Sequence, residues 1–129
     1  MNLPKNLLYT KDHEWARIEG KTAYIGITDY AQSALGDITF IELPKPDELL
    51  IQSKHCATVE SVKAASDVYA PLSGKVLAVN TQLGAHPELI NQSAYEKGYF
   101  FSMELTQETE KLNLMNASSY QNYCEGLTK

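Results

Sequence analysis

The sequence contains few cysteines and no cluster of basic residues. Cys56 and Cys124 are the only cysteines among 129 residues, which is too few to define a disulfide framework or a zinc site. We expect both to be free thiols. The net charge is −5 and the pI is near 5.1, whereas phosphate binding needs clustered cations. No nucleic-acid partner is therefore expected.

Long apolar runs are also missing. The sequence has no charged start followed by an apolar segment, and no apolar stretch of about 18 residues that could span a bilayer. We therefore expect no signal peptide, no membrane association and a cytoplasmic location. The three histidines, His13, His55 and His86, show no metal-ligand spacing with one another or with the cysteines. No metal site is predicted.

What is present fits one small β-rich domain. A chain of 129 residues has the size of a single domain, which we expect to span residues 1–129. Residues 16–18 and 22–27 flank Glu19-Gly20-Lys21, which predicts a hairpin with Gly20 at its turn.

The following segments predict a short helix and a strand. Thr28 or Asp29 can cap a helix that Gly36 would end by supplying a left-handed residue. Residues 38–43 are apolar on both faces, which predicts a strand enclosed on both sides and terminated at Pro44.

The C-terminal segment, at about residues 107–126, has apolar residues at helical spacing. Asn116 or Ser118 could cap this helix and Gly126 could stop it. Its aromatic side chains favour a core-facing stripe over a cofactor contact. The other predicted elements are a helical turn at 87–91 and a strand at 99–105.

Lys63 is the most informative residue for function. It lies at the predicted tip of a hairpin of about residues 56–79, whose second strand would run on continuously from Asp67. An ordinary exposed surface lysine is the simplest interpretation. Small neighbours such as Ser61 and Ala64 instead leave room for another protein to close around the lysine stem.

A family resemblance is carried by this hairpin and by several other blocks. The runs Glu60-Ser61-Val62-Lys63-Ala64, Tyr69-Ala70-Pro71 and Ser73-Gly74-Lys75-Val76 closely resemble the lipoyl-attachment signature of the glycine cleavage system H proteins. Matching blocks elsewhere are Tyr9-Thr10-Lys11-Asp12-His13-Glu14-Trp15, Gly26-Ile27-Thr28-Asp29-Tyr30-Ala31-Gln32, Leu35-Gly36-Asp37-Ile38, Glu42-Leu43-Pro44 and Pro87-Glu88-Leu89-Ile90-Asn91. The resemblance therefore covers residues 7–124 in collinear order.

The resemblance implies a fold and a function. The implied fold is mainly β, a barrel-sandwich hybrid or lipoyl hammerhead, with short peripheral helices and a C-terminal helix. The implied function is that of a lipoyl-bearing, non-catalytic carrier with lipoate bound covalently through Lys63. It would shuttle the aminomethyl intermediate from glycine decarboxylase to aminomethyltransferase and be reoxidised by dihydrolipoamide dehydrogenase. A lipoate ligase or a lipoyl/octanoyl transferase would attach the group, and a monomer is expected.

Site residues follow from the same resemblance, position by position. Glu14 and Asp67 match the carboxylates expected to dock the cationic end of the loaded arm. The alternatives are an exposed strand-end charge for Glu14 and a hairpin cap for Asp67. Recognition by the lipoylating enzyme is assigned to Glu60, Ser61, Val62 and Ala64. Gly74 matches a turn glycine, where a positive φ would be needed.

Other chemistries for this chain are weaker. A Schiff-base lysine needs burial or a nearby cation to lower its pKa, and a tip flanked by Glu60 and Asp67 offers neither. The serines lack a G-x-S-x-G frame. Biotin carriers also present a lysine on a hairpin of a related fold but typically flank it with methionines. Here Val62 and Ala64 flank Lys63, so lipoate is favoured.

Two departures from the family pattern keep alternatives open. Most members have glycines in the stretch that corresponds to residues 46–55, where this chain has none. The usual aromatic-rich Tyr-Gly-x-Gly-Trp element is Tyr95-Glu96-Lys97-Gly98-Tyr99 here. A diverged member could act as a lipoyl relay to 2-oxoacid dehydrogenases or in another lipoyl-dependent system. An unmodified binding or structural protein is the third hypothesis.

Overall fold

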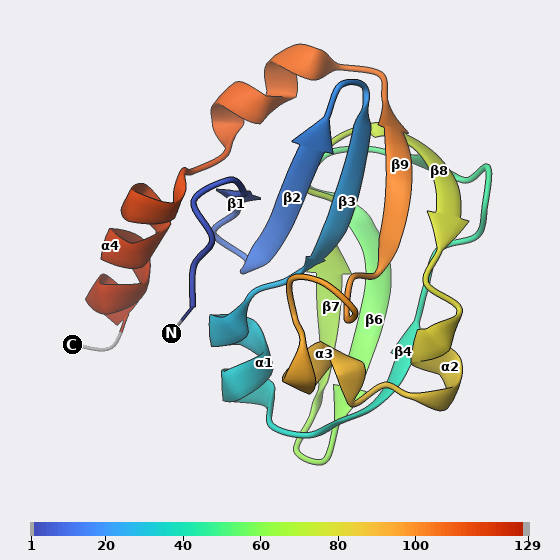
Figure 1. Cartoon of the computed structure of the whole chain (residues 1–129), viewed down its shortest axis with the longest axis vertical. Helices are drawn as coiled ribbons and strands as arrows, with labels where there is room; N and C mark the ends of the chain where they lie inside the picture. The colour runs from blue at the N-terminus through green and yellow to red at the C-terminus, as the bar shows by residue number, and fades with distance from the viewer. Residues whose placement is uncertain (1, 128–129) are drawn as a thin grey trace.

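Two antiparallel sheets, one behind the other in Figure 1, form the body of the computed structural model, which describes residues 2–127. The larger sheet has the strand order β1-β2-β3-β9-β8-β5, and the smaller has the order β4-β6-β7. The strands are β1 (Leu8–Tyr9), β2 (Glu14–Glu19), β3 (Thr22–Ile27), β4 (Ile38–Glu42), β5 (Leu49–Leu50), β6 (His55–Ser61), β7 (Ala65–Tyr69), β8 (Gly74–Val79) and β9 (Phe101–Leu105). The helices are α1 (Asp29–Leu35), α2 (Gln82–Ala85), α3 (Leu89–Gln92), a 3₁₀ segment η1 (Glu108–Asn113) and α4 (Ala117–Leu127). The predicted mainly β architecture with short helices and a C-terminal helix is confirmed.

Apolar side chains from both sheets form one core. Ile25 and Met103 of the larger sheet and Val59 of the smaller sheet belong to the same buried cluster, each with no exposed surface. Leu72, in the chain segment that crosses between the sheets, is equally buried. The core therefore holds the two sheets together, because burying apolar area is the main favourable contribution to folding.

A second cluster attaches α4 to the edge of the larger sheet. Tyr120 of α4 stacks on Tyr9 with ring centroids 4.8 Å apart. The Tyr120 hydroxyl lies 2.7 Å from Thr28 Oγ1 and 2.7 Å from His13 Nδ1, and burial raises the pKa of Tyr120. The predicted core-facing stripe is confirmed for Tyr120 and Cys124, which are buried, whereas Leu112 and Leu127 of the same pattern are exposed.

Several local predictions agree with the structure. Gly20 has a φ of 66° at the turn between β2 and β3, and Gly36 has a φ of 79° after α1. Thr28, not Asp29, caps α1, because Thr28 Oγ1 accepts a hydrogen bond from Ala31 N. At the start of α4, Asn116 Oδ1 accepts a bond from the Ser119 amide in the manner of a cap.

Four sequence-based expectations are wrong. The strand expected to be enclosed on both sides is β4, an edge strand with Phe40 53% exposed. The expected continuous strand after Asp67 breaks between β7 and β8, which belong to different sheets. Gly126 does not stop α4, which continues to Leu127. Gly74 does not have a positive φ. A Cβ at this position would collide with the carbonyl of Glu104 on β9, so the glycine is required because the β8 and β9 backbones lie close together.

The glycine-free stretch at residues 46–55 makes its tight turns with two non-glycine residues that have positive φ angles. Asp47 has a φ of 72° and Ser53 a φ of 71°, a left-handed conformation that costs L-residues about 1–2 kcal/mol. Two side-chain-bearing residues therefore occupy conformations that glycine would adopt without strain.

Some sequence-level expectations concern absences or the chain ends. Within residues 2–127, no helix combines the length and apolar character needed to cross a membrane. The same residues contain no group of three or more His, Cys, Asp or Glu side chains able to hold a metal ion. Cys56 and Cys124 are free and buried. Met1 and residues 128–129 of the expected domain lie outside the described part of the chain.

Candidate functional site

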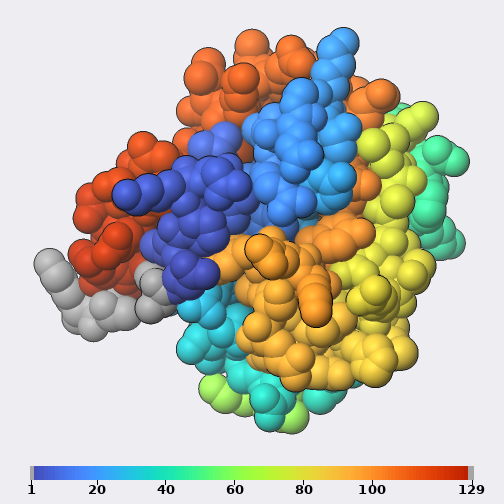
Figure 2. All heavy atoms as spheres, viewed as in Figure 1, coloured from blue at the N-terminus to red at the C-terminus, as the bar shows by residue number. Residues whose placement is uncertain are grey.

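The hairpin between β6 and β7 ends in a four-residue tip built around Ser61. The Ser61 amide donates to the Ala64 carbonyl at 2.8 Å, and Ser61 Oγ accepts bonds from the amides of Lys63 and Ala64 at 3.2 Å each. The Ser61 hydroxyl thus supplies hydrogen bonds that stabilise this turn, which lacks the Asn-Gly pair of the tightest hairpin turns. Figure 2 shows this tip, in light green, projecting at the lower end of the molecule.

Lys63 is exposed at this tip, as predicted. Its Nζ donates to the carbonyl of Ala34 at 3.3 Å, beside the C-terminal end of α1. Of the four residues assigned to recognition, Ser61, Val62 and Ala64 share this tip and Glu60 lies next to it on β6; only Ser61 among them is half-buried rather than exposed. The structure therefore groups Lys63 with Glu60, Ser61, Val62 and Ala64 on a surface that another protein can reach.

Glu14 lies at the other end of the hairpin and is buried, with only 2% of its surface exposed. Its carboxyl accepts a hydrogen bond from Thr10 Oγ1 at 2.5 Å and from the amide of Tyr69, at the end of β7, at 3.1 Å. Burial raises the pKa of Glu14 to about 7, although both hydrogen bonds act in the opposite direction. The exposed strand-end interpretation of Glu14 is therefore wrong.

A cavity of about 410 Å³ borders Glu14. Its walls come from four segments distant in the sequence: residues 9–12 with Glu14, 52–53, 69–71 and 113–115. The last segment follows η1, where the carboxylate of Glu110 accepts bonds from Ser73 N at 2.7 Å and Ser73 Oγ at 2.8 Å. Contacts between η1 and the β7–β8 connection thus fix one wall of this cavity.

Asp67 has a different environment from Glu14. It is exposed on β7, and its carboxylate lies 3.7 Å from Nε2 of His55 on β6. The residues lining the Glu14 cavity do not include Asp67. On β7 it lies between the Lys63 tip and Tyr69, whose amide binds Glu14. The structure therefore puts Asp67 between the tip and Tyr69 along β7, outside the cavity itself.

Sequence reasoning missed two of the groups that shape the Glu14 site. Thr10 bonds both the side chain and, through Oγ1, the backbone amide of Glu14. A hydroxyl residue four positions before an acid in a turn was an available signal for this contact. The Tyr69 amide, 55 residues away in the sequence, gave no such signal, because a backbone donor is the same for every residue type.

Comparisons with known proteins agree with one another. A protein-family model described as "Glycine cleavage H-protein" matches residues 7–126. The chain is 48% identical to the glycine cleavage system H protein of Halothermothrix orenii over 125 residues, covering 97% of this chain and 98% of that protein. It is 53% identical to the H protein of Bradyrhizobium diazoefficiens over 114 residues, covering 88% and 93% respectively. The crystal structure of a glycine cleavage system H protein from Mycobacterium marinum superimposes with a TM-score of 0.82 at 34% identity, covering 93% of this chain and 97% of that one.

Proposed function

The chain belongs to the glycine cleavage H-protein family, and on that premise we propose that it carries a lipoyl group in amide linkage on Lys63. The family is the lipoyl carrier of the glycine cleavage system, and the two-sheet fold matches the barrel-sandwich hybrid of its solved relative. The observation that supports the proposal most is that one hairpin joins an exposed lysine at its tip to a buried carboxyl and a cavity at its base.

The residues around Lys63 fit a covalently attached group. The amine is exposed, and Val62 beside it is 67% exposed, so an attaching enzyme can approach the lysine from solvent. Ala64 and Ser66 add little bulk around the lysine stem. A lipoyl group in this position supplies a disulfide that can be reduced and can carry a one-carbon amine fragment. The chain itself has to present that group and shelter its cargo.

Glu14 is the residue we assign to receive the cationic end of the cargo. An ammonium brought beside Glu14 favours the ionised carboxylate, because an opposite charge lowers the pKa of an acid. Thr10 and the Tyr69 amide hold the carboxyl in position before any cation arrives. Asp67, exposed between tip and cavity, would attract the same cation on its way along β7.

The remaining parts of the proposal concern partners and location. Glycine decarboxylase, aminomethyltransferase and dihydrolipoamide dehydrogenase would act on the carrier in turn, and a lipoate ligase or lipoyl/octanoyl transferase would modify it. The chain would act as a monomeric carrier without catalysis of its own. For the location, we propose the cytoplasm.

Intact mass spectrometry tests the attachment. After co-expression with a lipoate ligase and supplied lipoate, the purified protein should gain the mass of one lipoyl group. Lys63→Arg should gain nothing, whereas Lys75→Arg on β8 should gain the same mass as the wild type. An unmodified wild type, or a modified Lys63→Arg variant, would contradict the proposal.

A second assay tests the role in glycine cleavage. The modified protein should support glycine-dependent exchange of carbon dioxide by glycine decarboxylase, and Lys63→Arg should not. Glu14→Gln should still gain the lipoyl mass but should protect the loaded arm less against hydrolysis. Failure of the exchange with a fully modified wild type would argue instead for a lipoyl relay.

A further inference from the structure

Asn91 of α3 belongs to a block, Pro87 to Asn91, that the proposed function leaves without a role. Its side chain connects α1, the turn that follows it and the start of β4. Nδ2 donates to Gln32 Oε1 and to the Gly36 carbonyl at 2.9 Å each, and Oδ1 accepts a bond from the Ile38 amide at 2.9 Å. One half-buried amide therefore bonds to both sides of the turn at residues 36–38.

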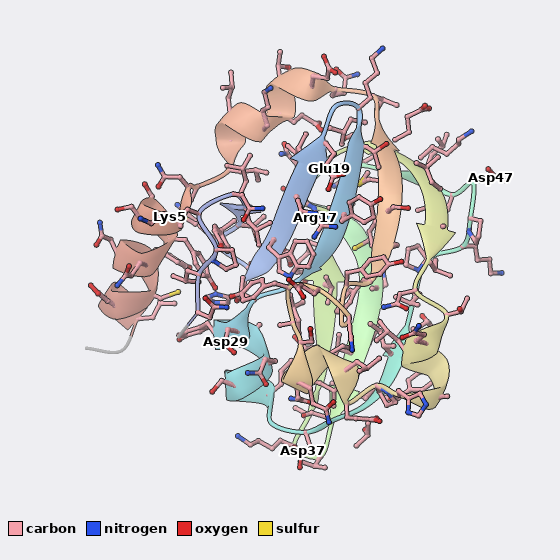
Figure 3. The ribbon with its side chains drawn as sticks, in the orientation of Figure 1. Lys5, Arg17, Glu19, Asp29, Asp37 and Asp47 are labelled. Atoms are coloured by element: carbon pink, nitrogen blue, oxygen red, sulfur yellow. The ribbon has the colours of Figure 1, made fainter. Side chains whose placement is uncertain are left out.

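The turn that Asn91 binds is the surface on which the Lys63 tip rests. The Asp37 carbonyl accepts a hydrogen bond from the Val62 amide at 3.1 Å. The Ala34 carbonyl accepts the bond from Lys63 Nζ, and the site of a Cβ on Gly36 would be 3.5 Å from Lys63 Cε. Figure 3 labels Asp37 at the lower end of the molecule, next to the hairpin tip, and Figure 1 shows α1 and α3 on the same side.

These contacts matter because the tip has few others. Several hydrogen bonds of residues 61–64 join Ser61, Lys63 and Ala64 to one another and stay inside the tip itself. Besides the pairing of Ser61 with Ile38 of β4, the bonds to Asp37 and Ala34 tie the tip to the rest of the molecule. An enzyme that modifies Lys63 gains when the lysine is already oriented, because less conformational entropy is lost on binding.

We propose that Asn91 is a positioning residue for the modification of Lys63, acting by fixing the α1–β4 turn on which the hairpin tip is seated. This rests on the proposed function, in which Lys63 is the residue that is modified. Asn91 touches neither the lysine nor any reacting atom; its effect passes through Asp37 and Val62.

Asn80 provides a matched control elsewhere in the fold. Its Nδ2 donates to the carbonyls of Lys97 and Tyr99 at 2.7 and 2.8 Å, and its Oδ1 accepts a bond from Gln82 N at 3.3 Å. Replacement of Asn by Asp at either position removes two donated bonds and keeps one accepted bond. The two variants therefore damage the same kind of contact, but only one of the sites adjoins the Lys63 tip.

The experiment compares Asn91→Asp with Asn80→Asp in two measurements. The first is amide hydrogen exchange of Val62 in the unmodified protein, followed by NMR. The second is kcat/KM for transfer of a lipoyl group to each variant by lipoate ligase. We expect Asn91→Asp to speed Val62 exchange and to lower kcat/KM, each about tenfold, the factor that corresponds to losing about one hydrogen bond. Asn80→Asp should change neither value, even where it lowers the melting temperature equally.

Each outcome decides between the alternatives. If Asn91→Asp and Asn80→Asp have the same kcat/KM, Asn91 has no positioning role. If Asn91→Asp does not fold, the wild type still provides a test. Its Val62 amide is bonded to Asp37 and should exchange more slowly than its Lys63 amide, which is bonded to Ser61 Oγ. Equal exchange rates would contradict the claim that the α1–β4 turn holds the tip. A wild type that accepts no lipoyl group refutes the proposed function instead, since Val62 exchange is measured without modification.

Discussion

Glu14 makes a pH-dependent contribution to stability that one substitution should remove. The pKa of this carboxyl is about 7 in the folded protein, against an ordinary value of 4.5. Between these two values the unfolded chain has lost the proton and the folded chain still holds it. Stability therefore falls as pH rises through this window, because the unfolded state binds fewer protons there. Glu14→Gln has no proton to lose, so its stability should not follow this decline.

The size of the effect follows from the two pKa values. About 1.4 kcal/mol per pH unit over the interval from 4.5 to about 7 gives roughly 3 kcal/mol. The wild type and Glu14→Gln should be closest in stability near pH 4.5, and the wild type should be less stable by up to about 3 kcal/mol above pH 8. Glutamine fits the site, because its oxygen can accept from the Tyr69 amide while its NH₂ group donates to Thr10 Oγ1.

Urea unfolding of the unmodified proteins between about pH 5 and pH 8.5 measures this difference. Glu104→Gln is the control, since it makes the same replacement at an exposed position on β9 and should give a stability curve nearly parallel to that of the wild type. If the curves of the wild type and Glu14→Gln also run parallel across this range, Glu14 does not titrate near neutrality, and our account of the cavity is refuted.

Three further substitutions test the packing that supports the site, each by urea unfolding. Gly74→Ala should cost about 1–3 kcal/mol, because its new methyl group meets the β9 backbone, whereas Gly84→Ala on α2, with open space around it, should be neutral or stabilising; equal effects would contradict the collision. Tyr120→Phe should cost about 1–3 kcal/mol by removing both hydrogen bonds of the buried hydroxyl, and a neutral result would show that they contribute nothing net. Ser53→Gly should stabilise by relieving the φ of 71°, by up to about 1 kcal/mol, and a loss of stability would mean that the Ser53 side chain matters more than the strain.

Local signals in the sequence predicted the parts of the fold that local physics determines. The turn at Gly20 and the capping of α1 by Thr28 depend on residues a few positions apart, so their chemistry is visible in a short window. The tip at Lys63 was predictable for the same reason. β1 and β5, with two residues each, are too short to show any periodicity.

The expectations that failed depend on contacts across the fold. Ile38 to Leu43 has the composition of an enclosed strand, but a bulge between Ile38 and Phe40 and a position at the sheet edge leave Phe40 exposed. Gly74 was correctly expected to need glycine, but for the wrong reason, because the close β9 backbone is not visible in the sequence. The burial of Glu14 likewise arises from segments that are distant along the chain.

The geometry of Glu14 supports the role that we propose for it, in which one carboxyl is both buried and able to dock a cation. A carboxylate has about four acceptor positions on its two oxygens, and here Thr10 and the Tyr69 amide use two of them. The remaining positions are available to an ammonium without displacement of either donor. An empty cavity favours the neutral acid, since burying an unpaired charge is costly, whereas a bound cation favours the ionised form. In the proposed dock, cation binding near neutral pH would therefore release a proton, and the affinity for a cation should rise with pH until the amine itself begins to lose its charge.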